Sequence, residues 1–374
     1  MNILIIDASQ PQLKTLQAGF EKSNSSLIYI NELDFSMNTL TTAKFNVVII
    51  SAALKKISAV KLLASLTNSF PAMVRVVISD QSTLLKHVDG LAHYNYMQPI
   101  NTKNIVQTIT SLAENQKAIT KESIIKAVAL VKTLPSPPKV YMQLNAVLKE
   151  NNADSKKISD IISQDPALAA KVLQFSNNAF MNKGKTLNSI SDAITKMGLD
   201  ALCCIVMTAE LFSYEPDIKG FSLLDQQLHC LATAKLAASL VKPELKQAAM
   251  LAGLLHDIGK IVLFEMNPKL TSLYLKNYKL TANNTALENK VFKTNHCQIG
   301  AYLLHMWSFS YTLIEAIILH HSPEKLLGKS FGVAQAVYLA DTLLHEREPC
   351  TKFIEHYKMQ GILEKLQDRA LRLK

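Results

Sequence analysis

The hydrophobic pattern divides this chain into two parts of different character. In residues 1–118, short continuous apolar runs alternate with segments of helical length. Continuous apolar strands separated by helices are typical of a parallel sheet that is covered on both faces. The expected strands are residues 3–6, 27–30, 47–50, 74–78 and, more weakly, 94–97. The pattern therefore predicts an α/β, flavodoxin-like domain whose site lies at the carboxyl ends of the strands.

Beyond residue 137 the apolar positions recur every three or four residues, which is the period of amphipathic helices. A helix that begins at Asn101 is expected to continue as far as Val131, where the proline-rich stretch Leu134–Pro138 stops it. That helix is either a signalling helix or a plain linker. The predicted order is a sheet domain over 1–118, a connecting helix or linker over 119–136, an all-helical domain over 137–345 and a helical tail over 346–374.

Two titratable residues end an apolar helical run in the second part. The run from Met250 to Leu255 leads into His256 and Asp257, and Gly259 predicts a helix end with left-handed backbone. Burying an imidazole and a carboxylate costs several kcal/mol unless each has a partner. A divalent metal is one such partner. The alternative is that His256 caps the helix and Asp257 stays in water.

Other segments supply further candidate ligands. Asp225 and His229 are four residues apart, which places both on one face of a helix. Asp341 takes an apolar position in a helical stripe, so its neighbours in space must explain it. The remaining candidates are His296, His320 and His321. Imidazoles and carboxylates suit iron, manganese or magnesium, and one carboxylate can bridge two ions. We expect these groups to converge on one cleft that holds one or two divalent metals.

The order of these residues, from His229 to Asp341, resembles the metal-binding series of the HD phosphohydrolase superfamily. Lys260 matches the lysine that follows the His-Asp pair in its HD-GYP cyclic-dinucleotide phosphodiesterases, and Asp225 falls where those enzymes carry an acidic residue. The Gly-Tyr-Pro motif of those enzymes is absent, because the chain reads Ser-Pro-Glu after His321. The resemblance implies a metal site, with Lys260 and Asp257 as catalytic residues if the protein is an enzyme.

Residues 161–177 and 190–198 resemble the HDOD family, the HD-related output domain. Together with the segments around Asp257, His296 and His321, the resemblance extends over about residues 132–345. The family implies a helical bundle used in bacterial signalling, in which many members have lost metal ligands. This sequence carries all of them.

Residues 1–118 resemble the receiver domain of two-component response regulators. Receivers need a phosphoacceptor aspartate, an acidic pair for magnesium, a hydroxyl and a lysine before a proline. Here Ser51 takes the phosphoacceptor position and Gln98 the lysine position. Asp7 alone represents the acidic pair, while Ser79 fits the hydroxyl position. Because the carboxylate nucleophile is missing, we expect a receiver fold that does not accept a phosphoryl group.

Composition limits the possible partners and the compartment. Lys and Arg exceed Asp and Glu by 40 to 30, a net charge of +10, but no helix-turn-helix, zinc finger or aromatic-basic interleaving points to nucleic acid. Five cysteines, without a Cys-x-x-Cys pair, indicate reduced core thiols. The chain starts without a basic signal segment, and no apolar run approaches the ~20 residues of a membrane span. We expect a cytoplasmic protein.

Two functions remain open from the sequence. The first is a non-enzymatic signalling regulator, in which a degenerate receiver is coupled to an HDOD output domain that binds divalent metal and contacts other signalling proteins or a second copy of the chain. The alternative is a metal-dependent phosphohydrolase or phosphodiesterase acting on a nucleotide or phosphoester. Catalysis also needs an open coordination position and a substrate pocket, so the ligand set favours metal binding over turnover.

Overall fold

The computed structural model describes the chain except for residues 1, 8–15, 17–18, 21–24, 43–44, 52–53, 71–72, 82–87, 89–90, 104, 107, 111–120, 130, 132–138, 150–153, 178–185, 212–217, 279–283, 308, 328 and 374. It divides into two compact units. The sheet unit comprises Met1–Ile124 with Ala301–Ile314, and the helical unit comprises Ile125–Gly300 with Glu315–Lys374. The middle of the expected helix from Asn101 to Val131, residues 111–120, and the proline stretch after it lie outside the described residues.

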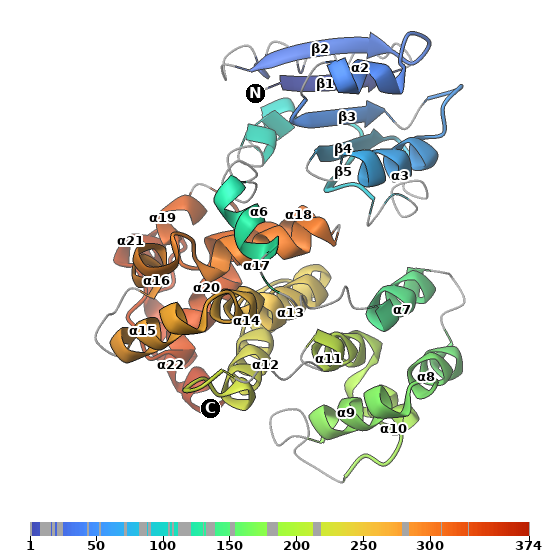
Figure 1. Cartoon of the computed structure of the whole chain (residues 1–374). Coiled ribbons are helices and arrows are strands. Elements are labelled where there is room, and N and C mark those ends of the chain that lie inside the picture. The colour runs from blue at the N-terminus through green and yellow to red at the C-terminus, as the bar shows by residue number, and fades with distance from the viewer. Residues whose placement is uncertain are drawn as a thin grey trace. The chain divides into compact units, whose positions relative to one another are not determined.

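The sheet unit contains a parallel sheet of five strands in the order β2-β1-β3-β4-β5 (Figure 1). The strands are β1 (Asn2–Asp7), β2 (Ser26–Asn31), β3 (Val47–Ser51), β4 (Val74–Ser79) and β5 (Tyr94–Met97). All five coincide with the predicted apolar runs. The strand order is that of the flavodoxin-like doubly wound fold.

Burial within the sheet follows the strand order. The three central strands are buried at nearly every position, as their continuous apolar sequences require, whereas the edge strands β2 and β5 are only partly buried. Residues Leu4, Ile6, Val48 and Ile50 pack with the helix α3 (Ala59–Ser69) in one core. A second described helix of this unit is α2 (Met37–Thr42).

The helical unit is built from helices of moderate length. In chain order they are α6 (Glu122–Ala129), α7 (Lys139–Lys149), α8 (Ser155–Ser163), α9 (Pro166–Ser176), α10 (Ile190–Met197), α11 (Leu199–Leu211), α12 (Leu223–Leu240), η1 (Pro243–Leu245), α13 (Lys246–Leu255), α14 (Ile258–Glu265), α15 (Pro268–Tyr278), α16 (Asn284–Phe292), α17 (His296–Met306), α18 (Tyr311–Leu319), α19 (Pro323–Leu326), α20 (Val333–Leu344), α21 (Thr351–His356), η2 (Gln360–Ile362) and α22 (Leu363–Leu371). The first of them starts among the residues of the sheet unit, and α17 and α18 each have residues assigned to both units.

Local signals explain several helix ends. Asp165 accepts hydrogen bonds from the N–H groups of Ala167 and Leu168, and Pro166 lies in the first turn of α9. Gly198 ends α10 with a φ of 81°, which a residue with a side chain rarely adopts. The C-terminal tail, which we expected to be helical over 346–374, does not form a single helix. Two helices, α21 and α22, form instead, because the chain turns at Lys358 with a φ of 55°.

The helix α12 forms the centre of the helical unit, where it packs against α13 and α20 (Figure 1). The helical stretch Pro243–Glu265 is 23 residues long and apolar enough to cross a membrane. Our expectation that no apolar run reaches that length was therefore wrong, because η1, α13 and α14 follow one another almost without interruption. Its most apolar window is 83% buried within the fold, as a core helix must be.

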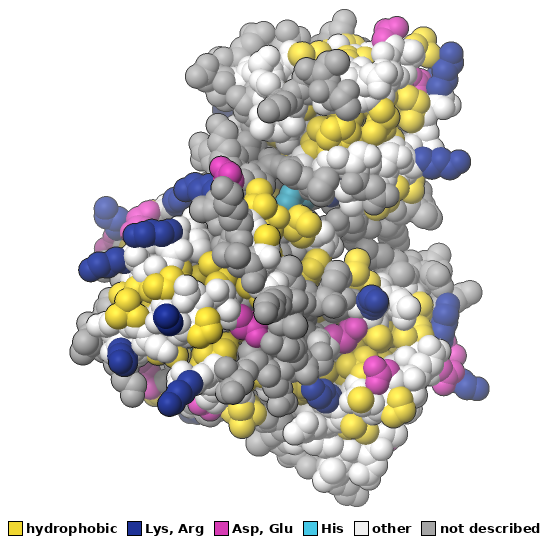
Figure 2. Space-filling model, in the orientation of Figure 1, with side chains coloured by type: hydrophobic (Ala, Val, Ile, Leu, Met, Phe, Trp, Pro, Cys, Tyr) yellow, Lys and Arg dark blue, Asp and Glu magenta, His cyan; other side chains and the backbone are white. Residues whose placement is uncertain are grey.

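The described cations on one face of the molecule form no single basic patch. Figure 2 shows their side chains scattered among acidic and apolar ones. All five cysteines are free thiols, and four of them are buried.

Candidate metal centre

Five segments of the helical unit place imidazoles and carboxylates at one point. The helix α12 supplies His229 from its second turn, and α20 supplies Asp341. The His256–Asp257 pair lies in the break between α13 and α14. The other ligands come from two helix ends: His296 opens α17, and His320 and His321 follow α18.

Gly259 allows two of these segments to approach each other closely. A Cβ atom at this position would lie 2.0 Å from the carbonyl oxygen of His296 and 2.6 Å from the nitrogen of Gly300. Our prediction that Gly259 ends a helix in left-handed backbone was wrong, because it belongs to the first turn of α14. Its missing side chain instead lets the start of α17 lie against α14, which brings His296 to Asp257.

The first group of candidate ligands surrounds the Nε2 atoms of His229 and His256, which lie 3.2 Å apart. Oδ1 of Asp341 lies 3.0 Å from Nε2 of His229 and 3.4 Å from Nε2 of His256. Oδ2 of Asp257 lies 3.3 Å from Nε2 of His256. Four side chains therefore direct ligand atoms at one small volume.

The second group lies on the other side of the Asp257 carboxylate. Nε2 of His296 and Nε2 of His320 lie 3.2 Å apart. Oδ1 of Asp257 lies 3.2 Å from the first of these atoms and 3.9 Å from the second. His321 and Cys297 offer further ligand atoms, and the four side chains besides Asp257 have ligand atoms within 4.8 Å of one another. Asp257 thus directs one oxygen at each group.

Hydrogen bonds fix the orientation of three imidazoles. Nδ1–H of His256 donates to the carbonyl of Gly253 at 2.7 Å, and Nδ1–H of His320 donates to the carbonyl of Ile317 at 2.6 Å. His296 donates from Nδ1 to the buried carboxylate of Glu288 at 2.7 Å. Because Nδ1 is the donor in each case, each ring directs its Nε2 atom into the site, as metal-ligating histidines do.

A cation fits this arrangement. Two Nε2 lone pairs that face each other at 3.2 Å repel unless a proton or a metal lies between them. In addition, Oδ1 of Asp257 and Oδ2 of Asp341 are buried without a hydrogen-bond partner among the described residues. Leaving a carboxylate oxygen unpaired in the interior is costly. Both defects disappear when divalent ions are bound, so the donor set fits the predicted metal.

Burial and charge set the protonation of these ligands. Burial lowers the pKa of His229 to about 4 and the pKa of His321 to about 3, and it lowers the pKa of His320 well below its usual value. These imidazoles are neutral at pH 7 and ready to bind a cation. For His256, burial also favours the neutral ring, but the charge of Asp257 outweighs it and raises the pKa well above its usual value. A metal at Nε2 displaces that proton.

Two neighbours hold Asp257 in place. Nζ of Lys260 lies 2.5 Å from its Oδ2 atom, and Nε2 of Gln226 donates to the same oxygen at 2.8 Å. Lys260 is 7% exposed. Burial opposes its charge, but the Asp257 carboxylate prevails and raises the pKa of Lys260. In the structure Lys260 therefore orients the carboxylate that lies between the two groups.

The structure places Asp225 apart from the other candidates. Its side chain is exposed in the first turn of α12, and it belongs to none of the described groups of converging ligand atoms. Its neighbour Gln226 faces the site instead.

Sequence reasoning missed four polar residues at the site: Gln226, Glu288, Cys297 and His345. His345 lies one turn after Asp341, with its Nδ1 atom 3.0 Å from Oδ1 of that residue, so the i, i+4 spacing was a usable signal. Glu288 has no comparable signal, because its helix α16 resembles an ordinary polar helix.

The positions that correspond to a receiver site are buried at the ends of the central strands. Asp7, Ser51 and Ser79 are 0%, 1% and 2% exposed, while Gln98 is partly exposed. The hydroxyl of Ser79 accepts a hydrogen bond from the N–H of Gln81 at 2.9 Å. Of these four positions, only Asp7 carries a carboxylate.

Comparisons with known proteins agree with the helical architecture. A curated relative, an uncharacterized protein of Treponema pallidum (strain Nichols), is 25% identical over 199 residues, which cover 50% of this chain and 38% of that protein. The chain thus matches well under half of that relative's length.

Solved structures share the fold. A candidate phosphohydrolase from Shewanella amazonensis SB2B superposes with a TM-score of 0.53 at 21% identity, over 68% of this chain and 100% of that chain. An HDOD domain protein from Geobacter sulfurreducens gives 0.53 at 20% identity, over 69% and 89%. A candidate signal transduction protein from Marinobacter aquaeolei VT8 gives 0.55 at 18% identity, over 84% and 81%.

The HDOD domain family matches residues 134–323, which is half of the chain. The matched range contains His229, His256, Asp257, His296 and the His320–His321 pair. This chain belongs to the HDOD domain family.

Proposed function

We propose that this protein is a bacterial signal-transduction regulator whose helical unit binds a pair of divalent metal ions. His229, His256, Asp341 and Asp257 would hold one ion. His296, His320, His321 and Asp257 would hold the other. The observation that carries the proposal is the Asp257 carboxylate, which directs one oxygen at each imidazole pair while Lys260 and Gln226 fix its orientation.

The sheet unit is proposed to be a receiver-like module that does not accept a phosphoryl group. Support comes from Ser51 at the phosphoacceptor position and Gln98 at the lysine position, because neither side chain can replace the lost carboxylate or ammonium. Such a module acts through contacts with other proteins. We further propose that the protein is cytoplasmic and that it contacts signalling partners or a second copy of the chain.

A second candidate function is metal-dependent hydrolysis of a phosphoester. A cavity with a cationic side chain lies beside His321 and favours this candidate. Divalent ions supply Lewis acidity and an activated water in such sites. The residues of this chain would position the carboxylate, through Lys260, and exclude bulk water, since His256, His296 and His320 are 0% exposed.

Metal analysis of the purified chain tests the proposal. The wild type is expected to contain bound iron or manganese, and the His256→Ala/Asp257→Ala variant is expected to lose it, because both ions share Asp257. Equal metal content in the two proteins would contradict the proposal. Turnover of phosphoesters near ~10 per second in the wild type, lost in the variant, would establish the hydrolase instead of the regulator.

A further inference from the structure

A polar cavity of about 200 Å³ opens beside the candidate metal centre. His321 lines it directly, and Thr342 lines it next to Asp341 in α20. Tyr338, from the preceding turn of α20, and Asn284, from the start of α16, form other parts of the wall. A ligand in this cavity would therefore contact the metal centre at its His321 side.

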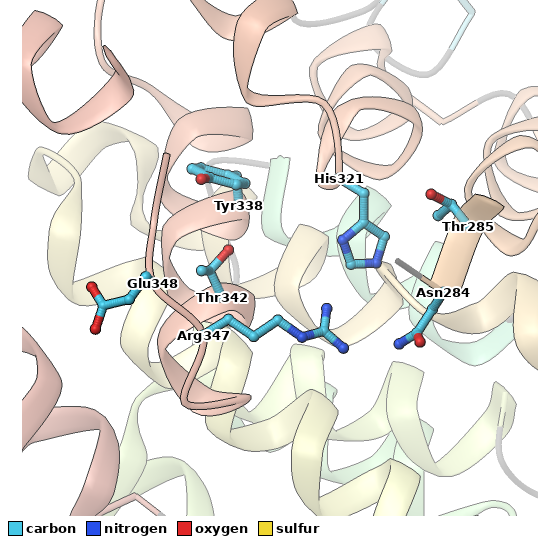
Figure 3. Close-up of a pocket in the computed structure, with 7 residues that line it drawn as sticks. All are labelled: Asn284, Thr285, His321, Tyr338, Thr342, Arg347 and Glu348. Atoms are coloured by element: carbon cyan, nitrogen blue, oxygen red, sulfur yellow. The ribbon is translucent and has the colours of Figure 1, made fainter. Parts of the chain in front are cut away.

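Arg347 supplies the positive charge of this cavity. Figure 3 shows its guanidinium group extending below the ring of His321 toward the amide of Asn284. The side chain is half-buried, and in the described part of the chain no carboxylate lies within ion-pair distance of it. The N–H of Arg347 donates to the carbonyl of Thr342 at 3.0 Å, which holds the start of the side chain at the cavity.

The other polar groups of the wall leave room for an anion. Asn284 is 6% exposed, and its amide faces the cavity opposite Arg347 (Figure 3). The hydroxyl of Tyr338 accepts a hydrogen bond from the N–H of Cys350 at 2.8 Å. Glu348 also borders the cavity, but its carboxylate points away from the guanidinium group (Figure 3). Arg347 and Asn284 both direct N–H donors into the cavity (Figure 3).

We propose that this cavity binds the phosphoryl group of a phosphate ester, with Arg347 as the anion-binding residue. A guanidinium group pairs with two oxygens at once, which suits carboxylates and phosphates. A carboxylate has only two oxygens, and the guanidinium group would use both. A phosphoryl group keeps a further oxygen for a divalent ion on the His321 side. This step rests on the proposed metal centre and assigns Arg347 as the residue that would bind the phosphoester considered above.

Calorimetric titration of the full chain with inorganic phosphate tests the assignment, with manganese-loaded and metal-free protein measured in parallel. Arg347→Ala is expected to weaken phosphate binding about 10- to 100-fold, which is the usual effect of losing hydrogen bonds to a charged group. Arg347→Lys should restore part of the affinity, because it keeps the charge without the paired donors. Arg372→Ala, a change at an exposed arginine, is the matched control and should leave the affinity unchanged.

Two further measurements separate the possible outcomes. Metal content is determined for every variant. A wild type that binds no metal would refute the proposed function. The effect of Arg347→Ala on phosphate binding by metal-free protein would still test the anion site. Asn284→Asp places a negative charge opposite Arg347 and should also weaken binding, which keeps a test available if Arg347→Ala does not fold. Unchanged phosphate affinity in folded Arg347→Ala, or no phosphate binding by wild type in either form, would overturn the assignment.

Discussion

The two units of this protein treat buried polar groups in opposite ways. At the strand ends of the sheet unit, Ser51 and Ser79 are buried hydroxyls, and Asp7 is the one carboxylate among the positions that a receiver needs. In the helical unit, two carboxylates and six imidazoles converge, and two of the carboxylate oxygens have no hydrogen-bond partner among the described residues. The strand-end positions thus carry a single carboxylate, whereas the helical unit brings several titratable groups together.

Buried histidines of the two units also differ in their neighbours. In the sheet unit, His93 accepts a hydrogen bond at Nδ1 from the N–H of Arg75, 3.0 Å away, and its Nε2 atom lies 3.2 Å from Nδ1 of His305. Burial lowers its pKa well below the usual value, and the charge of Arg75 lowers it further. In the helical unit, His256 lies against two carboxylates instead. Buried imidazoles therefore mark a cation site only where carboxylates accompany them.

The largest effect is expected from removing the carboxylate of Asp257. Asp257→Ala leaves the buried ammonium group of Lys260 without the oxygen 2.5 Å away, which should lower the free energy of unfolding by about 3–5 kcal/mol in metal-free protein. Adding Lys260→Met should recover most of the loss, because the charge is removed as well. Ser51→Ala in the sheet unit should cost only about 1 kcal/mol. Urea unfolding in the presence of a chelator measures the stability of all three variants. If Asp257→Ala were as stable as the wild type, the ion pair with Lys260 would not stabilise the fold.

A somewhat smaller effect is expected from Gly259→Ala. The added methyl group would lie 2.0 Å from the carbonyl oxygen of His296, so α14 and α17 must separate at a cost of about 3 kcal/mol. Gly361→Ala is the matched control, since a Cβ there meets nothing within 4 Å, and it should change stability by less than about 0.5 kcal/mol. Thermal unfolding compares the two. Equal melting temperatures would mean that the close approach at Gly259 does not constrain the site.

The pH dependence of stability tests the protonation of the buried His93 ring. Because the folded-state pKa of His93 lies below the ordinary value of 6.5, the unfolded chain binds more protons below that pH. The contribution of His93 is thus complete above pH 6.5 and declines as the pH falls through it, by about 1.4 kcal/mol per pH unit. His93→Asn should make the stability curve shallower between pH 5 and 6.5, by about one proton. An identical slope in the variant would contradict the depressed pKa.

No effect at all is expected when the sheet unit is treated with a phosphoryl donor. Incubation with acetyl phosphate, followed by intact-mass measurement, should leave the mass of the chain unchanged, since Ser51 replaces the nucleophilic carboxylate. A canonical receiver domain treated in the same way serves as the positive control. A stoichiometric phosphoryl adduct on the sheet unit would remove the contrast between the two units.

The sequence predicted the strands and most of the converging side chains because their signals are local. Buried parallel strands are continuous apolar runs, and Asp341 stands out as a carboxylate within an apolar stripe. The supporting residues could not be predicted in this way. Glu288 and Gln226 lie in helices of ordinary polar appearance, and only the folded packing shows that they contact His296 and Asp257.

Gly259 shows why the remaining errors arose. A glycine after an apolar helix predicts a helix end when only the local chain is considered. Its actual role depends on α17, a segment that begins 37 residues later and packs against it at backbone distance. Likewise, the break in the C-terminal tail depends on the conformation of Lys358, which no apolar pattern indicates.

Metal content, measured by elemental analysis after equilibrium dialysis against manganese, tests the central claim most directly. We expect up to two ions per wild-type chain. His229→Ala should lose one of them and His320→Ala the other. Asp257→Ala should lose both, because that carboxylate directs an oxygen at each imidazole pair. Each variant is first shown to be folded by circular dichroism. A metal-free wild type, or folded variants that hold as much manganese as the wild type, would contradict the proposed pair of metal ions.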